Sequence, residues 1–169
     1  MRMLLVFALP LLLLVGCGYH FPGKGGTLPG GVQRLHIPLF INQTAKPQLE
    51  NRLSNRVSEV FARNDNIVIV EQHAQAQAVL EVVINSYAAV PLSYNQNDVI
   101  SEYRTTMTLA AKLRQVEDGR LLWSGTLSWY ENYEAVSDKG LQYDLENDAI
   151  TEINLRLSEE LLYRLLDNF

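Results

Sequence analysis

The sequence has few of the residues from which catalytic and metal sites are built. Its 169 residues include one cysteine, Cys17, and three histidines, His20, His36 and His73, which lie at no spacing typical of a zinc site. The motifs GxSxG, HExxH and CxxC are absent. One cysteine also excludes an intrachain disulfide. We therefore expect no enzyme, no metal site and no cofactor other than a covalent lipid, discussed below.

An excess of positive charge is also missing. Lysine and arginine number 14 against 19 aspartates and glutamates, which gives a net charge of −5. Nucleic-acid-binding domains carry a basic footprint that neutralises phosphates. The composition therefore predicts no nucleic-acid partner.

No apolar run reaches the roughly 20 residues that a membrane-spanning helix needs. The most apolar stretch, residues 4–15, follows Arg2 and ends at Gly16, directly before Cys17. A short apolar core between a positive charge and a small residue is typical of a secretory signal peptide. We expect residues 1–16 to be cleaved, which leaves 13 basic against 19 acidic residues and a net charge of −6.

The segment Leu14-Val15-Gly16-Cys17 matches a bacterial lipobox. In such proteins the cysteine thiol is acylated, the chain is cut before the cysteine, and the new amino terminus is acylated too. Several acyl chains anchor a protein stably, whereas one chain gives only marginal membrane binding. We therefore predict lipidation of Cys17, and the alternative is an ordinary signal peptide with an incidental cysteine.

The rest of the mature chain is long enough for one domain. Residues 17–31 are rich in glycine and proline, which predicts a flexible tether between the lipid and the fold. Residues 32–169 then form a single domain, which at this size buries roughly 70% of the surface of its unfolded chain.

Hydrophobic periodicity predicts an α+β fold with a mixed four- to five-stranded sheet and two amphipathic helices packed on one face. Asp118-Gly119 is typical of a two-residue hairpin turn. In the first long strand we expect Leu80, Val82, Ile84, Ala88, Val90 and Leu92 to share one face, and in the last Leu121, Trp123, Leu127 and Trp129. The expected strands are residues 33–41, 67–70, 80–92, 101–114 and 121–133, and the expected helices are 47–64 and 143–166.

One predicted strand carries a row of cations. Arg104, Lys112 and Arg114 lie on one face with threonines between them, and Arg120 follows the hairpin turn. Cations and hydroxyl groups are what a phosphorylated headgroup requires. The alternative is an ordinary polar sheet surface with cross-strand charge pairs.

Several short segments, in this order, resemble the LptE family of lipopolysaccharide-assembly lipoproteins. Each segment alone has little specificity, but together they span nearly the whole chain. They are Cys17-Gly18-Tyr19-His20-Phe21, Leu28-Pro29, Phe40-Ile41-Asn42-Gln43-Thr44, Leu49-Glu50 with Leu53, and Ser101-Glu102-Tyr103-Arg104.

The resemblance implies a lipoprotein that sits as a plug in the outer-membrane β-barrel LptD. Such a protein helps the barrel to assemble and assists delivery of lipopolysaccharide to the outer leaflet. Gly18 after the lipidated cysteine, in place of aspartate, implies sorting to the outer membrane. Family members bind lipopolysaccharide through basic strand residues, for which Arg104, Lys112, Arg114 and Arg120 are candidates by charge and facing only.

A second hypothesis belongs to a different class of protein. An outer-membrane lipoprotein can reach across the periplasm and activate a peptidoglycan synthase. Such proteins often have long disordered tethers, whereas the tether predicted here is about fourteen residues long. The short tether favours a partner at the membrane.

Overall fold

The computed structural model describes residues 26–167, so Cys17 and the predicted signal peptide lie outside the described residues. The elements follow one another in an α+β order, as predicted. They are η2 (Pro29–Gly31), β1 (Arg34–His36), β2 (Ile41–Asn42), α2 (Leu49–Phe61), β3 (Val68–Ile69), η3 (His73–Gln75), β4 (Ala78–Tyr94), β5 (Ile100–Gln115), β6 (Leu121–Glu134) and α3 (Lys139–Asp167).

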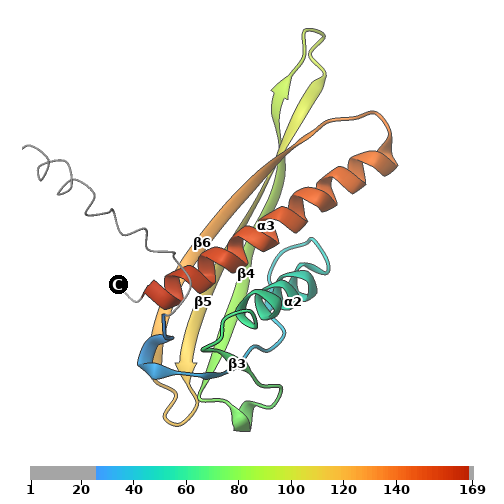
Figure 1. The fold of residues 1–169 in the computed structure, drawn as a ribbon. Coiled ribbons are helices and arrows are strands. Elements are labelled where there is room, and N and C mark those ends of the chain that lie inside the picture. The colour runs from blue at the N-terminus through green and yellow to red at the C-terminus, as the bar shows by residue number, and fades with distance from the viewer. Residues whose placement is uncertain (1–25, 168–169) are drawn as a thin grey trace, which may run out of the picture.

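The strands form one mixed sheet in the order β3-β1-β4-β5-β6, with β2 paired to β4 further along that strand. The short strands pair in parallel, whereas β4, β5 and β6 form a long antiparallel meander. Both helices lie on one face of this sheet, and α3 runs along the long strands (Figure 1). The predicted mixed sheet with two helices on one face is confirmed, although Pro38 divides the expected strand 33–41 into β1 and β2.

The core lies between the helices and the inner face of the sheet. On β5, buried side chains at odd positions alternate with more accessible ones at even positions, because successive residues of a strand point to opposite faces. Burial of each large apolar side chain contributes about 1.5–3 kcal/mol. The most deeply buried members include Leu49, Leu53 and Phe61 of α2, Leu80 and Ile84 of β4, Met107, Leu109 and Leu113 of β5, and Ile150, Leu157 and Leu161 of α3.

A β-bulge at Asn85 changes the face of β4. Ile84 pairs with Leu109, but Ser86 pairs with Thr108, so one residue of β4 has no partner. An extra residue in one strand exchanges inner and outer positions beyond it. As a result Tyr87 lies on the inner face.

The expected common face of β4 is therefore wrong beyond Ile84. Ala88 and Val90 pair with Thr106 and Arg104, which places them on the outer face, opposite to Leu80 and Ile84. Val90 is 50% exposed, and Leu92, at a second register shift, is also exposed.

A register shift likewise separates the start of β6 from the rest of that strand. Trp123 pairs with Leu113 and packs against the core, but Leu121 pairs with Arg114 and is exposed. Leu121 therefore does not share the apolar face of Trp123 and Leu127, as we expected. Trp129 pairs with Met107 and lies on that face, where it is partly exposed.

Residues 26–31, which we assigned to the flexible tether, pack against the domain. Leu28 and Pro29 are buried, and Gly30 lies against Leu122 at the start of β6. Gly26 lies against Leu166 near the end of α3. The packed part of the chain therefore begins before residue 32.

The molecule is elongated, and its two ends differ. At one end, which we call the proximal end, Gly26 lies against Leu166 near the end of α3. The β5–β6 turn lies toward the same end of the molecule (Figure 1). At the distal end the β4–β5 hairpin extends beyond both helices (Figure 1). Its exposed residues include Val90, Leu92, Tyr94 and Val99.

A polar cluster joins α3 and the segment before α2 to the inner face of the sheet. Lys46 Nζ lies 2.8 Å from Glu146 Oε1 of α3, and the Tyr87 hydroxyl donates to the same oxygen. Lys46 Nζ also lies 5.7 Å from the ring centroid of Tyr87 and from that of Tyr143. Burial raises the pKa of Tyr87 well above its ordinary value, so its hydroxyl remains a donor. Burial alone would raise the pKa of Glu146, but the hydrogen bonds from Lys46 and Tyr87 hold it below its usual value.

This cluster predicts a pH-dependent stability. Because the pKa of Glu146 is lower in the folded chain, its carboxylate stabilises the fold above the unfolded pKa, and this contribution is lost as the pH falls through the folded pKa. Glu146→Gln should lower the free energy of unfolding at neutral pH by about 1 kcal/mol and flatten its decline in acid. Urea unfolding across this pH range measures both effects. Glu117→Gln, in the exposed β5–β6 turn, is the control, and equal acid sensitivity of the Glu146→Gln variant and the unmodified chain would contradict the role of the cluster.

Candidate functional site

The predicted cationic row lies on the outer face of β5. Arg104, Lys112 and Arg114 occupy even positions of the strand, whereas the odd positions from 105 to 113 are buried beneath the helices. The expected common face is therefore present. However, Arg104 and Lys112 are separated by about 26 Å along the strand, because each residue advances it by roughly 3.3 Å. One phosphate group cannot contact both.

Two of the four candidates are already paired with carboxylates. Arg114 Nε lies 3.2 Å from Glu81 Oε2, and Arg114 also donates to the Gly119 carbonyl. Arg120 Nε lies 3.8 Å from Asp118 Oδ2. These contacts match the alternative of an ordinary charge-paired surface, so Arg114 and Arg120 offer less charge to a ligand.

The other two cations have no carboxylate partner within 4 Å among residues 26–167. The Arg104 guanidinium stacks 4.2 Å from the ring centroid of Tyr130, and its Nε donates to Asn132 Oδ1 at 2.9 Å. Lys112 is exposed and lies opposite Glu81, whose carboxylate is turned to Arg114. Lys112 is thus the most available cation of the row.

An apolar groove lies directly beside Lys112. Its volume is about 580 Å³, and Glu81, Val83, Ala110 and Lys112 form its floor on the outer face of the sheet. One wall is formed by the segment that joins β1 to β2 and by the start of β2, where Leu39 and Ile41 are 61% and 59% exposed. We name this feature the Lys112 groove. A cation in the lining of an apolar groove suits an amphipathic anion. The cationic row of β5 does not reveal this groove in the sequence, because one wall of the groove comes from residues 38–43.

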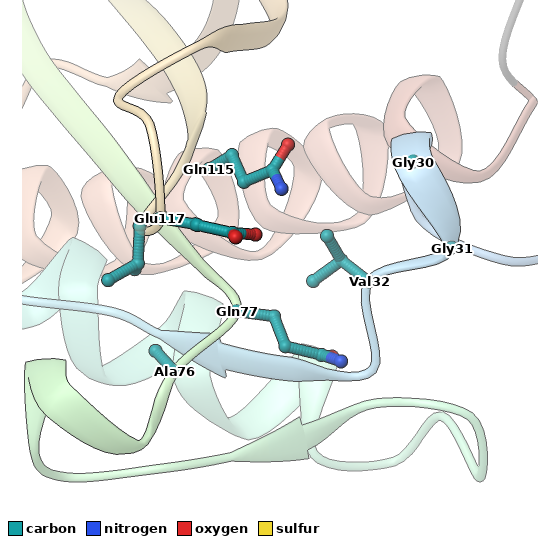
Figure 2. Close-up of a pocket in the computed structure, with 8 residues that line it drawn as sticks. Gly30, Gly31, Val32, Ala76, Gln77, Gln115 and Glu117 are labelled. Carbon is teal, nitrogen blue, oxygen red and sulfur yellow. The ribbon is translucent and has the colours of Figure 1, made fainter.

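A second cavity, of about 310 Å³, lies at the proximal end (Figure 2). Gln77 lies in it, and its Oε1 accepts hydrogen bonds from the backbone N–H groups of Gln33 and Arg34 at 2.8 and 3.0 Å. Glu117 is the one ionisable side chain of its lining, with no nucleophile or base beside it. The cavity therefore offers no catalytic arrangement.

Two histidines that are far apart in sequence lie together. The rings of His36 and His73 meet edge to face with centroids 6.1 Å apart, and His36 Nδ1 lies 3.0 Å from the Val70 carbonyl. Within the described residues no group of three or more metal-binding side chains forms around them or elsewhere. His20 lies outside those residues.

Between residues 26 and 167, no helix has both the length and the apolar character needed to cross a membrane.

Comparisons with known proteins add the family. The LptE family model, described as lipopolysaccharide-assembly, matches residues 32–165. No curated protein matches the chain.

Solved structures show the same fold at low sequence identity. The solution structure of an uncharacterized lipoprotein B from Nitrosomonas europaea is 14% identical, covers 88% of this chain and 90% of its own, and has a TM-score of 0.60. The hypothetical protein CT253 from Chlamydia trachomatis is 11% identical with a TM-score of 0.58, covering 80% and 96%. The rare lipoprotein B from Shewanella oneidensis is 15% identical with a TM-score of 0.50, covering 80% and 92%.

The match over residues 32–165 covers most of the chain and extends over the sheet, both helices and the cationic strand. This chain belongs to the LptE family of lipopolysaccharide-assembly lipoproteins.

Proposed function

We propose that this non-enzymatic protein is an outer-membrane lipoprotein, anchored through lipid on Cys17, that plugs and helps to assemble a LptD-type β-barrel and assists insertion of lipopolysaccharide into the outer leaflet. Membership of the family supports a role in lipopolysaccharide assembly. The lipid anchor, the barrel partner and direct contact with lipopolysaccharide are the parts that we propose.

The Lys112 groove is the observation that supports direct contact with lipopolysaccharide. Lipopolysaccharide combines phosphate groups with acyl chains. The Lys112 ammonium group can donate charge-assisted hydrogen bonds to a phosphate. Exposed Leu39 and Ile41 can bury part of an acyl chain, which is favourable in proportion to the apolar area removed from water.

The rest of the outer sheet face suits a polar lumen. Hydroxyl side chains occupy successive outward positions on β5 and β6, among them Thr106, Thr108, Thr126 and Ser128. The interior of a large outer-membrane barrel is itself polar. The hydroxyl groups in the middle of this face can therefore form hydrogen bonds in such a lumen.

The alternative role is activation of a periplasmic peptidoglycan synthase. The short segment between Cys17 and the packed domain disfavours this role, because it limits how far the domain can extend from the membrane. The packing of residues 26–31 leaves nine residue steps from Cys17 to Gly26, which span at most about 30 Å. A partner at the membrane surface lies within that distance.

The barrel partner predicts a stoichiometric complex. Extraction of the outer membrane with detergent and purification through a tag after Phe169 should recover a large β-barrel of the lipopolysaccharide-export type in near-equal amount. Mass spectrometry and quantitative gel analysis measure identity and ratio. Recovery of a peptidoglycan synthase, or of the lipoprotein alone, would rule out the plug.

Charge reversal at the groove tests the ligand. Lys112→Glu should weaken binding of purified lipopolysaccharide about ten-fold, because it replaces a charge-assisted contact with repulsion. The double variant Arg104→Glu, Lys112→Glu should weaken the binding of lipopolysaccharide further, because Arg104 is a second candidate for contact with phosphate. Lys139→Glu, at the start of α3, is the matched control. Unchanged affinity of the double variant in a direct binding assay would show that the cationic row does not bind lipopolysaccharide.

The proposed anchor requires covalent lipid on Cys17. Cells fed labelled palmitate should incorporate the label into the unmodified protein, and Cys17→Ser should abolish it because no other thiol is present. Label retained by Cys17→Ser would refute lipidation at this residue.

A further inference from the structure

Strand β6 forms an edge of the sheet, and its backbone orientation can be read from three hydrogen bonds. The Ala135 N–H donates to the Ser101 carbonyl, so odd positions face β5. The Thr126 carbonyl accepts from Arg164 at 3.2 Å, and the Glu134 carbonyl accepts from the Gln142 side chain at 3.5 Å. Both donors lie on α3, outside the sheet. Because no register shift interrupts β6 from residue 123 to 134, its even positions face the open edge.

These contacts from α3 limit the open edge to a short window. Between the occupied carbonyls of residues 126 and 134, the N–H and C=O groups of Ser128, Tyr130 and Asn132 face outward, and none of the hydrogen bonds among residues 26–167 reaches them. A hollow of about 510 Å³ lies over residues 128–132. An edge of unpaired backbone groups is a template for another strand. We name residues 128–132 the β6 window.

Aromatic side chains border the window on both sheet faces. Trp129 is 37% exposed on the inner face, and Tyr130 is 54% exposed on the outer face. An incoming strand places its alternate side chains beside them. Aromatic and apolar cross-strand neighbours stabilise the pairing of two strands.

Three glutamates and one arginine lie around the window, so its charge is net negative even though the Arg104 guanidinium is stacked on Tyr130. Glu102 and Glu134 lie directly opposite each other on β5 and β6, an arrangement that is unfavourable for like charges. Within residues 26–167, Glu131 accepts one hydrogen bond, from the Trp129 indole N–H at 3.3 Å. None of these three carboxylates has an ion pair in the described part of the chain. A cationic occupant would relieve this repulsion.

We propose that the β6 window binds an extended, cationic segment of the partner barrel by strand addition. The segment pairs its backbone with Ser128, Tyr130 and Asn132, places an apolar side chain against Trp129, and brings lysine or arginine to the glutamates. The inference rests on the proposed function for the protein that carries this segment. A lipid lacks regularly spaced backbone groups, and a second copy of this chain would bring the same glutamates together.

Amide hydrogen exchange tests the pairing in the full-length protein. In the purified complex with the barrel, the amides of Ser128, Tyr130 and Asn132 should exchange at least ten-fold more slowly than in the lipoprotein alone. The amides of Leu127 and Trp129 already face β5, so they should change little and serve as an internal control. A complex in which the even-numbered amides keep their exchange rates overturns the inference while the plug stands.

Two other outcomes also overturn the proposal that the β6 window pairs with a strand of the barrel. Recovery of no barrel removes both the proposed function and the strand that depends on it. Protection of the even-numbered amides in the lipoprotein alone, increasing with its concentration, assigns the window to a second copy instead.

A proline substitution tests the edge directly. Ser128→Pro removes an outward N–H while the ladder between β5 and β6 remains, and proline is tolerated on edge strands. It should reduce recovery of the barrel at least ten-fold at an unchanged melting temperature, and Ser128→Ala, which removes only the hydroxyl, should recover it fully. Equal recovery with both variants overturns the proposal.

Charge reversal provides a second variant if Ser128→Pro does not fold. Glu131→Lys should repel the cationic segment and reduce barrel recovery several-fold, whereas Glu117→Lys at the opposite end should not. Equal recovery with these two variants likewise overturns strand addition by a cationic segment.

Discussion

The two-residue alternation of the long strands is the constraint on which the rest of the molecule depends. Because helices α2 and α3 cover one face of the sheet, every odd residue of β5 from 105 to 113 is buried and its even neighbours remain accessible. The same rule therefore builds the core and presents Arg104, Lys112 and the hydroxyl groups on the other side. The cationic row and the hydrophobic core are two consequences of one pattern.

A single inserted residue modifies that pattern with large effect. The bulge at Asn85 brings Tyr87 to the inner face, where it meets Glu146, and through that carboxylate Lys46. Without the bulge, Tyr87 would point away from α3 and the cluster would lack one of its three members. The same shift turns Val90 outward, so the distal hairpin exposes apolar side chains on a surface that is polar nearer the middle of the sheet.

The periodicity of the sequence predicts the helices and the long strands. It does not predict features that depend on pairing between distant segments. The helices, the long strands and the outward placement of Lys112 follow from local spacing. The bulge gives no such signal, since apolar residues continue at the same spacing through residue 90. The Lys112 groove needs the segment around Leu39 to lie beside β4 and β5, and the meeting of His36 with His73 needs β1 to pair with β3. The burial of Leu28 was missed because its glycine-rich surroundings are typical of a tether.

The placement of both ends of the domain has a mechanical consequence. Gly26 and Leu166 adjoin at the proximal end, whereas the β6 window lies toward the other end of the long strands. Tension between the amino-terminal segment and a contact at that window would act along β4, β5 and β6 and would load their hydrogen bonds in shear. Hydrogen bonds between strands that are loaded in shear share the force and must break together, whereas bonds loaded from one end open one after another. The domain would therefore transmit force between the proposed lipid anchor and the proposed partner without separating its strands.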